Sequence, residues 1–207
     1  MSTRAARLIL AFAIFGLLAG IPARADAPAA LPPPDKPDAK AAPAPKSPAE
    51  QRAEIYGRLA GSSDADETQG LIGLLFGAYA ESGSDTGDLL LQRAGKAMAG
   101  KDFDAARQIL DSTVALLPDW AEGWNARATL RWLDDDYDGS MADIAETLKR
   151  EPRHIGALSG MAMILVARDK REDALKVYER VLTIAPHWRS AEEAAEKLKA
   201  SIAGQEL

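Results

Sequence analysis

The fold is decided by residues 87–188, which consist of three successive 34-residue stretches: GDLLLQRAGKAMAGKDFDAARQILDSTVALLPDW (87–120), AEGWNARATLRWLDDDYDGSMADIAETLKREPRH (121–154) and IGALSGMAMILVARDKREDALKVYERVLTIAPHW (155–188). They align without insertion or deletion, and in each an apolar run ends at a proline: Pro118, Pro152 and Pro186. A period of this length is typical of solenoids built from helical hairpins. A bundle with evenly spaced prolines is the alternative, but it leaves the other repeated positions unexplained.

Each stretch is predicted to form two antiparallel helices. Small residues recur in both halves and let the two backbones approach closely. At position eight of the stretch they are Ala94, Ala128 and Ala162, and at position twenty Ala106, Ser140 and Ala174. Polar triplets at 100–102, 134–136 and 168–170 separate the halves and indicate turns. The proline disfavours helix at the residue before it, so the second helix ends there.

This arrangement resembles the tetratricopeptide repeat, a 34-residue helix-turn-helix unit. The middle unit carries the resemblance through Trp124, Ala128, Tyr137, Ser140 and Pro152. The outer units carry it through Phe103, Ala106 and Pro118, and through Ala162, Ala174, Tyr178 and Pro186. The resemblance implies an all-α fold, a right-handed α-solenoid of antiparallel helix pairs, with repeats at 87–120, 121–154 and 155–188.

The units also depart from the family pattern. Position seven, usually leucine, is Arg93 and Arg127 in the first two units. Position eleven, usually aromatic, is Ala97, Arg131 and Leu165. The run from Trp124 to Ala128 nevertheless resembles exported repeat proteins of alphaproteobacteria, which implies a location in the bacterial envelope and no particular activity.

The amino-terminal segment 1–25 is predicted to be a secretory signal peptide. Basic residues precede an apolar run from Leu8 to Ile21, which is shorter than the ~20 residues that span a bilayer. Small residues at 23–25 suit cleavage after Ala25. An uncleaved membrane anchor is the alternative. The layout of the signal predicts a periplasmic location, and the absence of cysteine excludes a lipid-anchored lipoprotein.

Residues 26–48 are predicted to be a Pro/Ala-rich disordered linker, because they contain eight prolines and no aromatic residue. They serve either as a spacer, which we favour, or as a docking tract. Residues 49–86 are predicted to form a helical pair, a degenerate or capping repeat. Its Gly73 and Gly77 indicate close helix packing rather than a membrane role. Residues 189–207 are predicted to form a C-terminal capping helix that begins with a capping box, Ser190 and Glu193.

Charge and composition exclude several classes of protein. The net charge is −6, and loss of 1–25 with its three arginines makes it −9, which argues against nucleic-acid binding. A chain without cysteine cannot use a thiol nucleophile, a thiolate metal site or covalent haem. We predict no cofactor, no metal and no stable membrane span after signal cleavage.

Few residues are candidates for catalysis. His154 and His187 lie in inter-repeat turns at unlike positions, and we expect surface or packing roles for both. The acidic run from Asp134 to Asp138 could attract calcium, but it lacks the ordered spacing of a calcium loop. A solvated turn that caps the next helix is the favoured interpretation.

The resemblance implies a binding surface instead, because the first helices of tetratricopeptide units line the concave face. The contact residues predicted in this groove are Leu91, Met98, Asn125, Thr129, Trp132, Ser159 and Met163. Burial of Trp132 and Met98 by flanking helices is an equal alternative. The lysines and arginines with which some members grip a carboxylate are missing.

We therefore predict a non-enzymatic periplasmic module that binds a peptide or helix of a partner protein in its groove. A self-associating structural subunit of the cell envelope, a homo-oligomer, is the alternative. An enzyme is the third class, with His154 and the run from Asp134 to Asp138 as its candidate residues.

Overall fold

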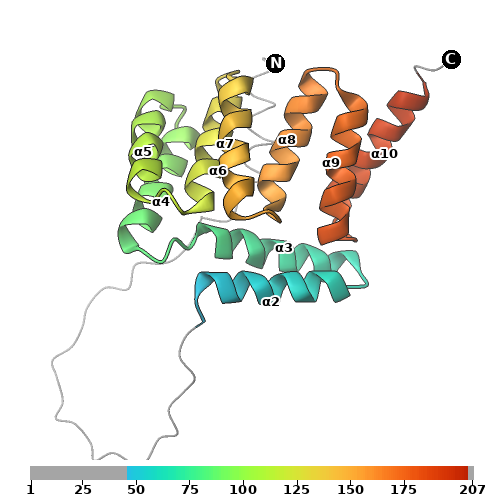
Figure 1. The fold of residues 1–207 in the computed structure, drawn as a ribbon, viewed down its shortest axis with the longest axis horizontal. Coiled ribbons are helices and arrows are strands. Elements are labelled where there is room, and N and C mark those ends of the chain that lie inside the picture. The colour runs from blue at the N-terminus through green and yellow to red at the C-terminus, as the bar shows by residue number, and fades with distance from the viewer. Residues whose placement is uncertain (1–45, 205–207) are drawn as a thin grey trace, which may run out of the picture.

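A computed structural model of the protein describes residues 46–204. The predicted signal peptide, residues 26–45 of the linker and residues 205–207 lie outside this range. Within it no strand is present, and the helices are α2 (Pro48–Gly61), α3 (Ala65–Ala80), α4 (Asp85–Ala99), α5 (Phe103–Leu116), α6 (Ala121–Leu133), α7 (Tyr137–Arg150), α8 (Ile155–Ala167), α9 (Arg171–Ile184) and α10 (Arg189–Ala203) (Figure 1).

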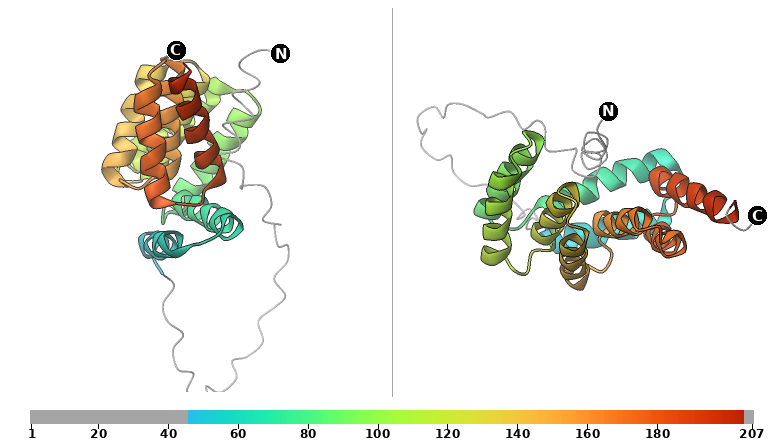
Figure 2. Two further views of the ribbon diagram at one scale, coloured as in Figure 1. Left: turned by 90° about the vertical axis from the view of Figure 1, so that its right-hand side faces the viewer. Right: turned by 90° about the horizontal axis from the view of Figure 1, so that it is seen from above.

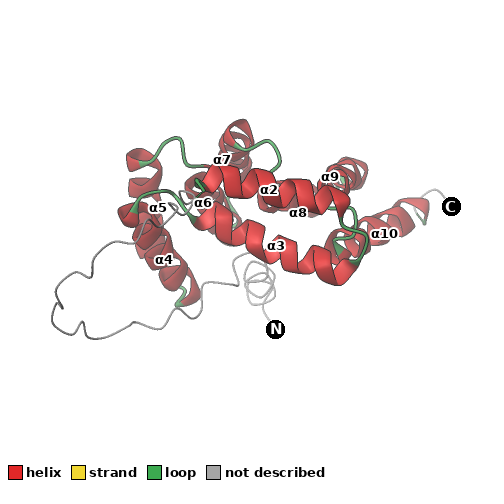
Figure 3. Ribbon diagram, turned by 90° about the horizontal axis from the view of Figure 1, so that it is seen from below, coloured by secondary structure: helices red, strands yellow, loops and turns green. Residues whose placement is uncertain are grey.

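Three antiparallel pairs, α4/α5, α6/α7 and α8/α9, stand side by side, and α10 packs on α9 at the end of the row (Figures 1 and 2). Each pair falls within its predicted unit, except that α4 begins two residues early. From below, α5, α7 and α9 lie along one side of the row, and α4, α6, α8 and α10 along the other (Figure 3). The predicted all-α solenoid is confirmed.

The turns within the pairs repeat with the sequence period. The middle residue of each polar triplet has a left-handed backbone, with φ of 62° at Lys101, 64° at Asp135 and 57° at Asp169. The residue after it is the N-cap of the second helix, and in two units it is an aspartate whose side chain accepts a backbone N–H, at Asp102 and Asp136. The triplets therefore form hairpin turns, as predicted.

The small residues lie where the two helices of a pair meet. Ala94, Ala128 and Ala162 are 0–3% exposed, and Ala106, Ser140 and Ala174 are 0–1% exposed. Ser140 satisfies its buried hydroxyl by donating to the carbonyl oxygen of Ala128 at 2.8 Å. The predicted close approach of the paired helices is thus present in every unit.

In the second unit, the departure at position seven is explained by a buried ion pair. Arg127 donates through Nε and Nη2 to both oxygens of Asp143, at 2.9 and 2.8 Å, and the Asp143 side chain is 3% exposed. Arg131 adds a contact of 3.1 Å to Asp143, and the exposed Asp111 accepts a hydrogen bond of 2.9 Å from Nη1 of Arg127. The hydrogen bond to Asp143 raises the pKa of Arg127. Charge here replaces the apolar contact that leucine makes elsewhere in the family.

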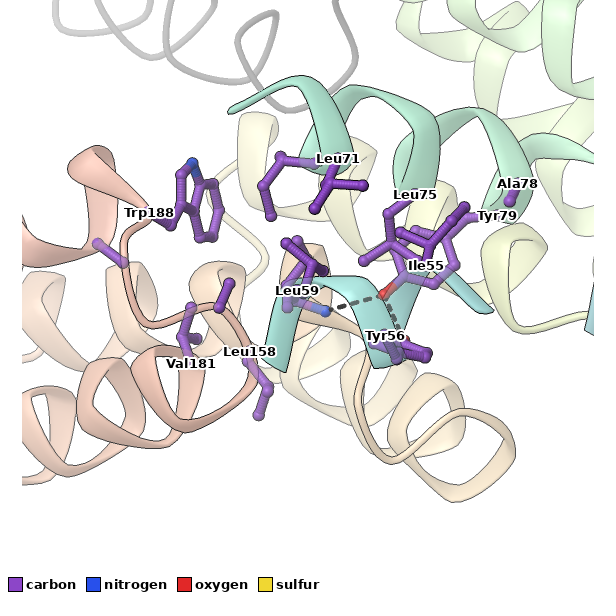
Figure 4. Close-up of a cluster of buried hydrophobic side chains, with 14 residues drawn as sticks. Ile55, Tyr56, Leu59, Leu71, Leu75, Ala78, Tyr79, Leu158, Val181 and Trp188 are labelled. Atoms are coloured by element: carbon purple, nitrogen blue, oxygen red, sulfur yellow. Dashed lines mark hydrogen bonds between the residues drawn. The ribbon is translucent and has the colours of Figure 1, made fainter. Parts of the chain in front are cut away.

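The pair α2/α3 is present, but it lies across the ends of the stacked helices instead of continuing the row (Figures 1 and 3). Its Leu59, Leu71 and Leu75 pack in one buried cluster with residues of α8, α9 and the turn before α10, including Leu158, Val181 and Trp188 (Figure 4). Polar contacts add to this cluster, among them Trp120 Nε1 donating to the Tyr79 carbonyl oxygen at 3.0 Å. This hairpin therefore braces units two and three.

Helix capping differs from prediction at the carboxyl end. The capping box at Ser190 and Glu193 is wrong, because α10 starts at Arg189 after Trp188 and has no side-chain cap. A complete capping box occurs instead at the start of α2, where Ser47 and Glu50 bond each other's backbone N–H.

Removing the carboxylate of Asp143 should destabilise the fold strongly, because two arginines would lose a buried partner. We expect Asp143→Ala to lower the free energy of unfolding in urea by about 3 kcal/mol. Asp111→Ala, at the exposed end of the same network, should cost less than about 1 kcal/mol. The double variant Arg127→Leu/Asp143→Leu should recover most of the loss. Equal stability of Asp143→Ala and wild type would show that the ion pair does not stabilise the fold.

Candidate functional site

Four of the seven predicted groove residues come together in the structure. Asn125, Thr129 and Trp132 of α6 and Met163 of α8 line one hollow between α6, α7 and α8. Its other lining residues are Ala128, Ser140, Ile144, Gly156 and Gly160. No charged side chain belongs to this lining. The hollow has a volume of about 20 Å³, enough for about one water molecule, so it is a small notch with a mostly apolar lining and not a deep pocket.

The other predicted residues lie elsewhere. Leu91 and Met98 are 2% and 4% exposed and belong to the core cluster that also contains Trp132. Ser159 is buried, and its Oγ is the one fully buried side-chain polar atom among residues 46–204 without a hydrogen-bond partner. The alternative prediction, that flanking helices bury Met98 and Trp132, is therefore correct for Met98. Trp132 is 9% exposed and contributes to both the core and the hollow.

A buried polar network begins beside the hollow. Asn125 donates through Nδ2 to both oxygens of Glu122 at 3.2 Å, and Glu122 Oε2 lies 2.9 Å from His154 Nε2. The other ring nitrogen of His154, Nδ1, accepts the backbone N–H of Ala157 at 3.1 Å and so caps α8. His154 is 0% exposed, and Glu122 and Asn125 are 8% and 4% exposed.

Two tyrosines of the α2/α3 hairpin complete the network. The Tyr79 ring stacks on His154 with centroids 3.8 Å apart. Its hydroxyl lies 2.6 Å from that of Tyr56 (Figure 4). Both hydroxyls reach the Arg153 carbonyl oxygen, and Tyr79 accepts the Ile155 N–H at 3.3 Å. Burial raises the pKa of both phenols above their ordinary value. The network thus joins the hairpin, the start of α8 and the hollow.

His154 has the packing role that the sequence predicted, but its partner was missed. Glu122 lies 32 residues earlier, at the second position of a unit whose last position is His154. These two positions meet only when the helices stack, so spacing along the chain gave no signal. Both ring nitrogens are occupied and the ring is fully covered, which leaves it no contact with a substrate. His187 makes no hydrogen bond or ion pair within residues 46–204.

The acidic run forms the predicted solvated turn. Asp136 caps α7 by accepting the Gly139 N–H at 2.9 Å. Asp134 and Asp138 bind arginines of the neighbouring units, Arg107 and Arg168, at 2.6 Å each. In the described part of the chain no three His, Cys, Asp or Glu side chains converge as metal ligands. These carboxylates therefore link adjacent repeats.

Removing the His154 ring should loosen the hairpin and the start of α8 together. His154→Ala loses a helix cap and leaves Glu122 without its buried donor, so we expect about 3 kcal/mol less stability toward urea. The matched control is His187→Ala, which should stay within about 0.5 kcal/mol of wild type. Comparable losses from the two histidine variants would show that the network does not stabilise the fold.

Alkaline pH should destabilise the protein through the buried phenols. Because folding raises their pKa above about 10, their contribution is complete below that pH and is lost as the pH rises further. Unfolding in urea should become easier above pH ~10, by up to about 1.4 kcal/mol per pH unit for each phenol. Tyr56→Phe should show a shallower dependence than wild type over the same range, and identical slopes would refute this origin.

Comparison with known proteins gives the family. No family model matches the chain. It is 40% identical over 158 residues to a TPR repeat-containing protein of Rhizobium etli, a match that covers 76% of this chain and 78% of the relative. It is 30% identical over 105 residues to the small glutamine-rich tetratricopeptide repeat-containing protein 2 of Saccharomyces cerevisiae, covering 51% of this chain and 30% of that protein.

Solved structures show the same fold. The first TPR of Spaghetti (RPAP3), bound to the HSP90 peptide SRMEEVD, matches with a TM-score of 0.55 at 21% identity over 58% of this chain and 98% of that one. The first TPR domain of human RPAP3 matches with a TM-score of 0.54 at 21% identity over 58% of this chain and 95% of that one. With the Rhizobium relative, the repeat period and the stacked hairpins in agreement, this chain belongs to the tetratricopeptide repeat family.

Proposed function

We propose that the protein is a periplasmic interaction module that binds an uncharged peptide or helix of a partner protein on the α6/α8 side of the solenoid. The location rests on the signal-peptide pattern of residues 1–25 and on the exported repeat proteins that the chain resembles. No helix within residues 46–204 has the length and apolar character needed to cross a membrane.

The observation that carries the proposal is the uncharged surface of α8. Its sequence IGALSGMAMILVA contains no charged residue, yet Met163 is only half-buried and Val166 is 42% exposed. Met163 is three residues from both Gly160 and Val166, so it lies beside the hollow on one side and beside the exposed Val166 on the other. An apolar surface that stays open beside a small notch suits a peptide backbone and its small side chains.

The solved relative supports binding of a peptide but indicates a different ligand chemistry. The peptide held by the RPAP3 domain, SRMEEVD, is acidic. The hollow of this chain offers no lysine or arginine to such a peptide. We therefore propose burial of uncharged groups as the mechanism, without catalysis.

Self-association is the second candidate, supported by the open face of α3. Within residues 46–204 no atom lies within 4 Å of a Cβ added at Gly70, Gly73 or Gly77, so the prediction of close helix packing at Gly73 and Gly77 is wrong. Leu74 on the same helix is 55% exposed. Two copies could bring such faces together, because glycines allow close approach of helix backbones.

Site-specific crosslinking in the periplasm can separate these functions. A photoreactive residue at Val166 should capture one recurrent partner, whereas the same residue at Leu116, 58% exposed on α5, should not. Met163→Glu should reduce the Val166 crosslink at least about tenfold because it places a charge on the apolar face, and Leu116→Glu should not. Capture of this chain alone would favour self-association, and equal crosslinking from both positions would reject the groove.

A further inference from the structure

Asn125 supplies the amide of the hollow, and its neighbours determine which end of that amide a ligand can use. An amide side chain has a donor end, Nδ2, and an acceptor end, Oδ1. The end that remains available decides which ligand groups can bind. A series of hydrogen bonds determines this orientation. It starts at a backbone N–H, which can only donate, and it ends at Asn125.

The first steps fix the tautomer of His154. The Ala157 N–H can only donate, so His154 Nδ1, 3.1 Å away, accepts and carries no proton. The neutral ring therefore carries its proton on Nε2, which lies 2.9 Å from Glu122 Oε2. Glu122 accepts this hydrogen bond, as a carboxylate does.

The next step fixes Asn125. Both oxygens of Glu122 lie 3.2 Å from Asn125 Nδ2, and a carboxylate cannot donate in return. Asn125 must turn its donor end toward Glu122. Its Oδ1 accepts no hydrogen bond from any residue of the described range, yet it is not among the fully buried atoms that lack a partner, so it still reaches solvent. Because Asn125 lines the hollow, Oδ1 is the polar atom it can offer there.

We infer that His154 and Glu122 are positioning residues that hold Asn125 as a hydrogen-bond acceptor, so that an uncharged peptide segment lying over the hollow can donate a main-chain N–H to its Oδ1. This rests on the proposed function and names the ligand chemistry. A carboxylate would set its lone pairs against those of Oδ1, and no cation in the lining compensates.

Ser159 is the equivalent residue in the next unit, but it offers nothing to a ligand. It occupies position five of the third unit, as Asn125 does in the second, on a helix that contacts α6. Its hydroxyl is fully buried, and it does not line the hollow. Of the two residues at position five, Asn125 is therefore the one that a peptide on this surface can reach.

The orientation can be tested without a ligand. Long-range proton–nitrogen correlation spectra of the labelled protein near neutral pH should show His154 with a protonated Nε2 and a bare Nδ1. The side-chain NH₂ of Asn125 should exchange more slowly in wild type than in Glu122→Gln. A proton on Nδ1 of His154, or exchange that is unchanged in Glu122→Gln, would overturn the inference whether or not the groove binds peptides.

The ligand class can be tested with two panels of synthetic peptides. One contains acetylated, amidated peptides of Ala, Gly, Ser, Thr, Leu and Met, and the other contains the same peptides with acidic residues and a free carboxylate. The neutral panel should bind better, and binding should fall with Met163→Glu. Preference for the acidic panel would overturn the inference. Absence of binding to both panels would instead contradict the proposed function, and the spectra would still decide the orientation.

Methylation of single backbone nitrogens in the best neutral peptide locates the contact. One methyl group should weaken binding to wild type about tenfold and should have little effect on Asn125→Ala, which has already lost the acceptor. Asn125→Leu, which retains side-chain volume, replaces the alanine variant if that variant unfolds. Equal sensitivity of wild type and the Asn125 variant to every methyl group would show that Oδ1 accepts nothing from the ligand.

Discussion

The rest of the structure depends on the close approach of two helices in each unit, at one small residue from either helix. Ala128 and Ser140 show the constraint most clearly, because the serine hydroxyl bonds the alanine carbonyl directly across the contact. A larger residue at either place would separate the backbones and shift the partner helix. Repetition of this contact every 34 residues gives successive pairs the same shape, so they stack, and α6 and α8 fall on one side of the row.

The α2/α3 hairpin adds a constraint that the repeats lack. Tyr79, near the end of α3, makes several of the contacts involved. Its carbonyl oxygen is bonded to Trp120, its ring is stacked on His154 and its hydroxyl is bonded to the Ile155 N–H. His154 in turn caps α8 and reaches Glu122 on α6. One connected set of contacts therefore holds the hairpin in place, caps the start of α8 and orients the amide of Asn125. The proposed binding surface is thus supported by a part of the chain outside the three repeats.

Sequence reasoning succeeded where the pattern is local or strictly periodic. Turns at the polar triplets, helix ends before the prolines and burial of the small residues all follow from single positions within a unit. It missed contacts that depend on how helices are rotated against each other, such as Arg127 with Asp143 and Glu122 with His154. The family pattern identified Arg127 as a departure but could not indicate the acid that compensates it, 16 residues away on the other helix of the pair.

The predicted groove residues do not all form one surface, because their exposure also depends on how neighbouring helices pack. Asn125, Thr129, Trp132 and Met163 meet at one hollow because α6 and α8 are neighbours in the row. Met98 holds the same position in the first unit as Trp132 in the second, but it belongs to the core cluster that Trp132 and Leu133 also enter. Residues at the same position of different units are thus buried to different degrees. How far such a residue is buried depends on the helices of the neighbouring unit, and the pattern of one unit does not describe those helices.

Within residues 46–204 two carboxylates are buried, Asp143 and Glu122, and they serve different purposes. Charged groups in a core gain little over apolar residues of the same volume, because desolvation offsets their attraction. Asp143 is explained by Arg127 and Arg131, which need a partner inside one helix pair. Glu122 has no such local need, since its donors are a neutral ring and an amide that apolar side chains could replace. What an apolar residue could not provide is a direction for the amide of Asn125, and that is the contribution which accounts for a buried carboxylate at this position.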